Sequence, residues 1–415
     1  MKKFTKRSLI AALSLTSLMT NVSADNLADA FSNGKVKGEI KSVYSDSNFL
    51  GKAKSDDIAT IGGSLGYITG DFYGFSAGAT FQVSHVLSED NNNGVFASDL
   101  DAQGYVLSES YLEYKLANTS AKAGRQFIYT PLVNTAIDGK SSESLLKDSF
   151  EAYLLTNSDI PDTTITLGYI SKYLAKTDGT GDVANSENFS LTNTFSAVPT
   201  NGTNSYDDAY TVLLKNNSIK DLTLQAQYLG LNGKESADKD INIAYFQADY
   251  VIANQTLSAQ LIKSKNDNQP TGQEDGLAYG FKATGPLGIS NLAYVAAFNS
   301  STEDGDVNLG MGTGTSDLLF TAMPVNGSGV PARANTDTLV GGIVIPILDV
   351  TTVAYAGNSW SNDMVGDVFA TGAMAIYPFY KNFLLKVNYE HVEVEESILE
   401  DGNTDVTRVY LSYKF

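Results

Sequence analysis

The chain contains no cysteine, so it can form neither a disulfide framework nor a thiolate site. It has only two histidines, His85 and His391, and neither stands in a pattern typical of a serine hydrolase or a zinc protease. Both lie near the ends of predicted strands, where a polar side chain at a rim is the simpler interpretation. The sequence thus shows no catalytic residues, although a serine–histidine pair formed only in space would not be visible in it.

Basic residues are scarce, with 28 lysines and arginines against 47 acids and a net charge of −19. So acidic a chain repels nucleic acid, and no basic patch reverses that repulsion. Beyond residue 24 the arginines are Arg125, Arg333 and Arg408 alone.

Long apolar runs are missing too, because no segment after residue 24 approaches the ~18 consecutive apolar residues of a membrane-spanning helix. The first 24 residues carry four basic residues, then a short apolar stretch, Leu9 to Met19, and end in Val22-Ser23-Ala24. This pattern predicts a cleaved secretory signal peptide over residues 1–24 and a single domain over residues 25–415.

Aromatic residues and glycine are abundant: 23 tyrosines and 19 phenylalanines stand beside one tryptophan, with 36 glycines. An exported, acidic, cysteine-free chain of this kind is typical of an outer-membrane β-barrel, whose aromatic residues form belts at the two membrane interfaces. A soluble secreted β-protein shares the composition, so the strand pattern must decide between the two.

Eighteen segments alternate apolar and polar residues as barrel strands do. We predict strands at 36–44, 59–69, 75–85, 106–116, 119–128, 149–156, 163–173, 208–215, 222–229, 241–250, 256–264, 277–284, 291–298, 338–345, 350–357, 367–377, 383–393 and 406–415. Tight turns alternate with longer loops such as 86–105, 174–207 and 299–337. All turns would therefore lie on one side of the wall, together with both termini.

A β-sandwich with one wet face also alternates, but the length, the regular spacing and the lack of a composition break favour a closed transmembrane antiparallel barrel. The last strand, Val406–Phe415, places Tyr413 and Phe415 on one face. A chain ending in an aromatic residue on such a strand resembles the terminal signal that the outer-membrane assembly machinery reads.

One loop carries an unusual mixture of residues between the fifth and sixth predicted strands. Four apolar residues, Pro131, Leu132, Val133 and Ile137, stand among charged ones. A loop folded into a barrel has one side on the wall and one toward the pore; a long surface hairpin loop is the alternative. The candidate constriction charges are Arg125, Asp138, Lys140, Glu143, Lys147 and Asp148.

Strand parity gives candidates for the lumen wall. Glu109 and Glu113 on the fourth strand and Arg408 on the last are expected to face inward. For Arg125 the turn decides: a two-residue turn puts it on the outward face of Leu112, and a three-residue turn directs it inward. We favour the inward register, because a charge on the lipid face at mid-membrane costs ~2–4 kcal/mol.

No metal or cofactor site is predicted. Asp304, Asp306 and Asn308 match the start of a calcium loop, but Leu309 and Thr315 replace the required glycine and glutamate. The acidic loops could gather Ca²⁺ only loosely.

Four segments resemble the OprD-type outer-membrane porins: Ala123–Gln126, Thr130–Thr135, Ile160–Leu167 and, for the campylobacter-group branch that includes major outer-membrane porins, Asp29–Gly38. The resemblance implies an 18-stranded barrel, a third loop folded into the lumen and often a trimer. Substrate-selective members carry a ladder of arginines along the wall. This chain has mainly lysines instead, such as Lys41, Lys172, Lys263 and Lys386, which favours a general channel over a carboxylate-selective one.

We therefore expect a porin for passive diffusion of small hydrophilic solutes and ions, weakly cation-preferring and narrowed by residues 128–147. Its expected partners are those solutes, outer-membrane lipid, two further copies in a homotrimer and the assembly machinery, but no nucleic acid. The alternatives are a barrel whose long loops, above all 299–337, serve as adhesin or receptor, and an outer-membrane hydrolase. Ionic conductance would separate the first from both.

Overall fold

The computed structural model describes residues 26–48, 55–90, 92, 100, 102–175, 206–233, 240–266, 275–302, 305–325, 327, 329–361, 366–395 and 402–415. The predicted signal peptide, residues 1–24, lies outside these ranges. Within them the chain forms eighteen strands, a short α-helix α1 (Leu27–Ser32) and a 3-10 helix η1 (Thr313–Asp317).

The strands are β1 (Lys35–Asn48), β2 (Asp56–Ile68), β3 (Phe75–Asp90), β4 (Gly104–Leu116), β5 (Thr119–Gln126), β6 (Ser149–Asn157), β7 (Thr163–Leu174), β8 (Tyr206–Asn216), β9 (Leu222–Gly233), β10 (Ile241–Ile252), β11 (Gln255–Asn266), β12 (Gly276–Pro286), β13 (Ala293–Ser301), β14 (Thr336–Ile347), β15 (Val350–Ser361), β16 (Asp367–Tyr380), β17 (Phe383–Glu395) and β18 (Gly402–Lys414).

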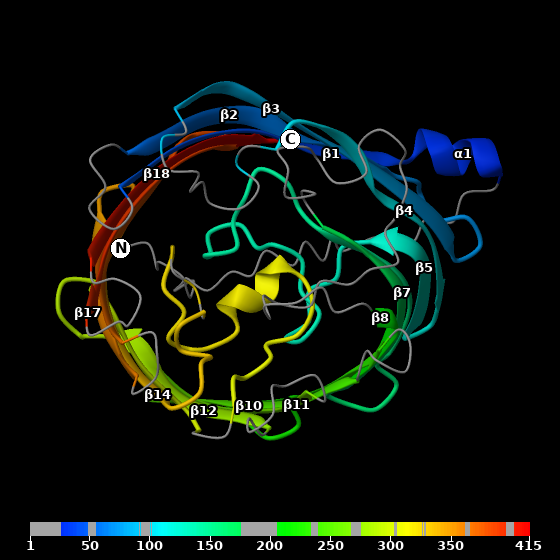
Figure 1. Cartoon of the computed structure of the whole chain (residues 1–415). Helices are drawn as coiled ribbons and strands as arrows, with labels where there is room; N and C mark the ends of the chain where they lie inside the picture. Colours follow the sequence, from blue (N-terminus) through cyan, green and yellow to red (C-terminus); the bar gives the residue numbers. More distant parts are fainter. Residues whose placement is uncertain are drawn as a thin grey trace, which may run out of the picture.

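Each strand pairs antiparallel with its neighbours in sequence, and β1 pairs with β18, so the sheet closes on itself. Figure 1 shows the resulting ring, with inward segments at its centre. The predicted number of strands and the antiparallel barrel are confirmed. Most strands run further toward the long loops than predicted, because alternation fades where both faces of a strand meet water.

The two faces of the wall differ as the alternation predicts. Along β3, Thr80 and Gln82 are each 3% exposed, whereas the intervening Phe81 and the following Val83 are each 50% exposed. An apolar outer surface around a polar interior is the inverse of a soluble protein, and it suits a wall that faces lipid.

Aromatic side chains form belts on this outer wall. Near the turns, the rings of Phe75 and Tyr114 are 4.5 Å apart and those of Phe383 and Tyr413 are 4.6 Å apart. Further up, Tyr169 pairs with Tyr210, whose ring lies 5.9 Å from that of Tyr228. Such belts mark the membrane interfaces of a barrel.

The short connections adopt the turn conformations that tight hairpins require. Ala253 and Asn254, between β10 and β11, both have positive φ, of 50° and 63°, as in a type I′ turn. At the amino-terminal end, α1 is capped by Asn26, whose side chain accepts from the Asp29 N–H. In the described ranges, no helix is both long and apolar enough to cross a membrane.

Within the described residues, two loops fold into the barrel. The first inward loop, residues 127–148 between β5 and β6, was predicted from its apolar residues. The second inward loop, the described part of residues 302–335 between β13 and β14, corrects a prediction. We expected 299–337 to be a long surface loop, but Val307, Leu309 and Met311 are at most 4% exposed, and η1 lies inside the ring of strands (Figure 1).

Candidate functional site

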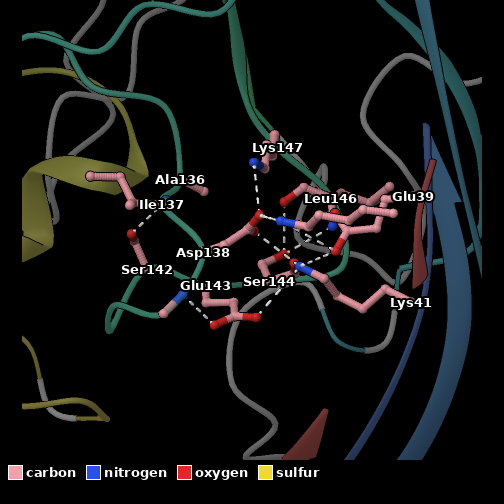
Figure 2. Close-up of polar contacts among 12 residues, drawn as sticks. Glu39, Lys41, Ala136, Ile137, Asp138, Ser142, Glu143, Ser144, Leu146 and Lys147 are labelled. Atoms are coloured by element: carbon pink, nitrogen blue, oxygen red, sulfur yellow. Dashed lines mark hydrogen bonds and ion pairs between the residues drawn. The ribbon is translucent and has the colours of Figure 1, made fainter. Parts of the chain in front are cut away.

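The candidate site is a cluster of charges where the first inward loop meets the wall. Asp138 Oδ1 lies 3.0 Å from Lys41 Nζ on β1, and Oδ2 lies 2.9 Å from Lys414 Nζ on β18. Within the loop, Lys147 Nζ is 3.4 Å from Asp138 Oδ2. Figure 2 shows Lys41 and Lys147 pointing at this carboxylate from opposite sides. One loop carboxylate therefore contacts three ammonium groups.

Glu143 extends the cluster to a third strand. Its carboxylate forms an ion pair with Lys386 on β17 and lies 3.5 Å from Lys41 Nζ. It also accepts a 2.5 Å hydrogen bond from the Gly139 N–H, which closes the tip of the loop. The side chains of Glu143 and Lys386 are 7% and 3% exposed, so their charges compensate each other away from bulk water.

Both loop acids remain ionised at neutral pH. Burial by itself raises the pKa of Asp138, but the opposing attraction of Lys41, Lys147 and Lys414 brings it well below its ordinary value. For Glu143 burial likewise raises the pKa, and Lys41 and Lys386 lower it further than burial raises it. The loop thus presents fixed negative charges to the lysines of the wall.

The two inward loops bind each other through backbone and carboxylate groups. The Met311 N–H donates to the Leu132 carbonyl, and the Asn134 N–H donates to the Met311 carbonyl. Both hydrogen bonds are 2.9 Å long. Asp317 accepts hydrogen bonds from the amide and hydroxyl groups of Ser141 and Ser142. The two inward loops therefore form one connected structure inside the barrel.

Apolar contacts fix this joint to the wall. Leu132 and Val133 of the first loop pack with Leu309 of the second in one buried cluster. That cluster includes residues of the wall from β6 to β12, for instance Ile243. On the opposite side, Leu145 packs in a separate cluster with residues of β1, β2 and β18.

Only some of the predicted constriction residues meet in the charged cluster. Asp138, Glu143 and Lys147 meet in the cluster, whereas Lys140 is exposed at the loop tip. Asp148 is fully buried, and its carboxylate accepts hydrogen bonds of 2.9 Å from the N–H groups of Ala136 and Thr313. Its charge holds the two loops together, so we place it outside the pore lining.

The predicted lumen-wall acids lie below the loop on β4. Glu109 is 3.4 Å from Lys37 Nζ and accepts a 2.7 Å hydrogen bond from Thr80. Glu113 lies 3.2 Å from Lys115 Nζ. Arg408 shares the inward face of β18 with Tyr410 and Ser412 and is 9% exposed. All three stand on the inward side of their strands, where parity placed them.

Arg125 corrects the favoured register. Glu113 pairs with Lys122 and Ser110 with Arg125, so the turn has two residues and Arg125 belongs to the outward face. Its guanidinium donates to the Leu107 carbonyl and lies 3.6 Å from Glu151. In the strand register Arg125 lies two residues beyond Ala123, which is level with Tyr153 and Tyr169 of the upper aromatic belt. Its side chain is only 8% exposed, and near the interface an outward charge costs only ~0–1 kcal/mol.

Other members of the site escaped the sequence analysis. Lys414 and Asp317 were not singled out, nor was Glu39, whose carboxylate lies 3.9 Å from Lys41 Nζ and 3.8 Å from Lys414 Nζ. Lys41 and Lys386 were named only as wall lysines. Parity places Lys41 and Lys386 on the inward face, but no local pattern pairs them with a loop about a hundred or more residues away. Lys172 and Lys263, named with them, lie on the outward face beside Glu151 and Asp275.

Two further observations delimit the site. A cavity of about 520 Å³ lies on the outer wall between β4 and β7, lined by Leu112, Tyr153 and Tyr169 among others, and it faces away from the lumen. Among the described residues, no three His, Asp or Glu side chains are grouped so that they could hold a metal ion.

Comparison with known proteins defines the fold class. No family model matches the sequence, and no curated protein matches it. Solved structures do match: OccK3 (OpdO) of Pseudomonas aeruginosa has a TM-score of 0.71 at 12% identity, over 94% of this chain and 97% of that one. The chain therefore has the barrel fold that this structure represents.

Two more structures agree. The outer membrane protein opdK of Pseudomonas aeruginosa has a TM-score of 0.71 at 14% identity, over 93% of this chain and 99% of that one. OccAB1 of Acinetobacter baumannii has a TM-score of 0.71 at 14% identity, over 93% and 97%. At these identities the likeness shows a shared fold along nearly the whole chain.

Proposed function

We propose that this protein is an OprD-type porin of the outer membrane, exported by its signal peptide, through which small hydrophilic solutes and ions diffuse passively. The observation that carries the proposal is the charged cluster of Asp138 and Glu143 against the lysines of the wall, inside a barrel whose outer face suits lipid. The likeness to the outer membrane protein opdK supports the location.

The proposal includes a weak cation preference, because the chain is strongly acidic overall. The preference is weak because Lys41, Lys386 and Lys414 compensate the two acids at the constriction. Charges act strongly at such a point, since every permeating ion passes close by and solvent screening is reduced.

The proposal also covers assembly. The protein would form a homotrimer and would be inserted by the assembly machinery, which reads Tyr413 and Phe415. The resemblance of Asp29–Gly38 would place it in the campylobacter-group branch.

Planar-bilayer recording tests the proposal. The purified protein should form ion-conducting channels, and deletion of Asn134 to Ser142 should enlarge the single-channel conductance. Changing Asp138 and Glu143 together to lysine should shift the reversal potential in a salt gradient toward anion preference. Absence of any conductance from correctly folded barrels would overturn the proposal.

The control must carry the same charge change away from the lumen. Glu303 and Asp304 would be natural controls from sequence, but they lie outside the described residues. Asp337 on β14 and Glu393 on β17 stand on the outward face, so the pair Asp337→Lys and Glu393→Lys should shift selectivity much less. An equal shift from both pairs would place residues 128–147 outside the conduit.

The alternatives have less support. The adhesin interpretation relied on the 299–337 loop as a surface loop, and residues 305–325 of it lie inside the barrel (Figure 1). The hydrolase reading needs a histidine beside a serine, whereas His391 contacts Asp405 at 2.8 Å and Glu393 at 3.2 Å on the outer face.

A further inference from the structure

Lys41 is an unusual residue for the wall of a conduit, because it is only 2% exposed. Its ammonium has three N–H donors. The nearest groups are Asp138 Oδ1 at 3.0 Å, the Ser144 carbonyl at 3.2 Å and Glu143 Oε1 at 3.5 Å (Figure 2). These three belong to the first inward loop, and Glu39 of the same strand follows at 3.9 Å. A lysine enclosed in this way is not available to passing ions, so its contacts act on the loop.

The contacts of Lys41 lie where the barrel closes. Its strand, β1, pairs with β18, and in that register Lys41 faces Ser412 and Glu39 faces Lys414. The pairing of β1 with β18 is the closure seam of the barrel. Asp138 forms an ion pair with one lysine from each of these two strands, and Glu143 forms an ion pair with Lys386 of the next strand, β17. The loop is thus held by three consecutive strands, and Lys41 contacts both acids of the charged cluster, Asp138 and Glu143.

Packing on each side shows what these ion pairs hold in place. Leu145, two residues after Glu143, is 5% exposed and packs with Val43, Ile58 and Tyr410 of the wall. On the other flank, Asp317 of the second inward loop accepts from Ser141 and Ser142. Residues 141–145, which these contacts anchor, form no helix or strand. Their position therefore depends on the side chains that bind them.

We infer that Lys41 is the positioning residue of the constriction. It draws Asp138, Glu143 and the Ser144 carbonyl against the closure seam, and so sets both the width of the conduit and the share of the two carboxylates' charge that reaches passing ions. The inference deepens the proposed function and rests on it. Lys386 and Lys414 assist from the neighbouring strands.

A matched lysine makes the inference testable. Lys37 lies four residues from Lys41 on the same inward face of β1, but its side chain is 50% exposed and pairs with Glu109 on β4, not with the loop. Lys37→Gln and Lys41→Gln therefore remove the same charge from the same strand. Only Lys41→Gln should release the loop.

The absence of cysteine supplies the readout, because an introduced thiol is the only one in the chain. With Leu145→Cys as background, we would measure the rate of modification by a methanethiosulfonate reagent on folded, membrane-embedded protein. Adding Lys41→Gln should accelerate the reaction roughly tenfold or more, since loss of a charged hydrogen-bonding group promotes local opening. Adding Lys37→Gln should leave the rate at the background value.

Two companion variants protect the test against misfolding. If Lys41→Gln does not fold into the barrel, Asp138→Asn with Glu143→Gln releases the same contacts from the loop side and should accelerate labelling equally. Lys41→Met keeps nearly the volume of the side chain but removes the ammonium, so it should accelerate labelling as Lys41→Gln does. If Lys41 only filled space, the rate of Lys41→Met would stay at the background value.

Bilayer recordings separate the inference from the function beneath it. Lys41→Gln should give larger, noisier single-channel currents and a stronger cation preference, whereas Lys37→Gln should change preference without added noise. Equal labelling rates and equal noise in the two variants would overturn the positioning role. A wild-type barrel without conductance would instead defeat the porin proposal, and the thiol measurement, which needs no current, would still report on Lys41.

Discussion

Asp148 and Thr313 are 165 positions apart in the chain, and the Thr313 N–H donates a 2.9 Å hydrogen bond to the Asp148 carboxylate. The same carboxylate accepts from the Ala136 N–H at 2.9 Å and from the Tyr173 hydroxyl at 3.3 Å. One buried acid therefore connects the first inward loop, the second inward loop and β7.

Replacing this acid should loosen both loops. In Asp148→Asn one of the two acceptor oxygens becomes an NH₂ group, so a buried N–H of Ala136 or Thr313 loses its partner at a cost of about 1–3 kcal/mol. We expect a lower free energy of unfolding in denaturant titration and noisier channel currents. Tyr173→Phe, which removes only the third hydrogen bond, is the control and should have a smaller effect on both. If the two variants had equal effects, the Tyr173 hydrogen bond, and not the two backbone ones, would be what holds the loops together.

The two arginines on opposite faces test the register of β5. Arg408 faces the lumen and Arg125 the outer face, so Arg408→Gln should move the reversal potential toward cation preference while Arg125→Gln leaves it near wild type. Both variants remove one positive charge, and bilayer recording in a salt gradient compares them directly. A larger shift from Arg125→Gln would restore the inward register.

The contribution of the loop carboxylates to stability follows from their pKa values. Burial raises the pKa of both groups, but Lys41, Lys147 and Lys414 lower that of Asp138 further, and Lys41 and Lys386 lower that of Glu143 further than burial and the Asp138 charge raise it. Both pKa values therefore lie below their ordinary values in the folded protein. The stabilisation is therefore complete above the ordinary carboxyl pKa values of about 4, and is lost only as pH falls through the lowered ones.

Channel behaviour should accordingly be constant from about pH 5 to pH 8 with respect to these groups, and loop release should begin only in stronger acid. The measurement is single-channel noise as a function of pH. Asp138→Asn with Glu143→Gln is the control, since it should be noisy at every pH. A transition near pH 6 in the wild type would show that other groups hold the loop.

The carboxyl terminus offers a test of assembly. The Phe415 N–H donates to the Gly38 carbonyl at 3.0 Å, and the Gly38 N–H donates to the Phe415 carbonyl at 2.9 Å. The Phe415 ring itself is 47% exposed on the outer face. Phe415→Asp should keep the backbone pair yet reduce the amount inserted in the outer membrane, whereas Phe415→Tyr should not. Normal outer-membrane levels of Phe415→Asp would remove the terminal residue from the assembly signal.

Much of the barrel is local in origin, which is why sequence reasoning recovered it. The side chains of β3 alternate because its backbone repeats every two residues, and turns such as Ala253-Asn254 need only their own conformations. The inward first loop was also foreseeable, because Leu132 and Val133 have no place on a solvated surface. Arg125 was misplaced because the length of a single turn inverts the face of a whole strand.

The sequence by itself determined the eighteen strands, which of their faces is polar, and the presence of Asp138 and Glu143 in a partly apolar loop. Only the tertiary structure decided that Lys41 and Lys414, from opposite ends of the chain, hold one carboxylate, and that the second inward loop lies inside the barrel instead of covering the surface. The physical reason is closure. Pairing β1 with β18 places residues more than 370 positions apart side by side, and no pattern of period two records which loop will meet them there.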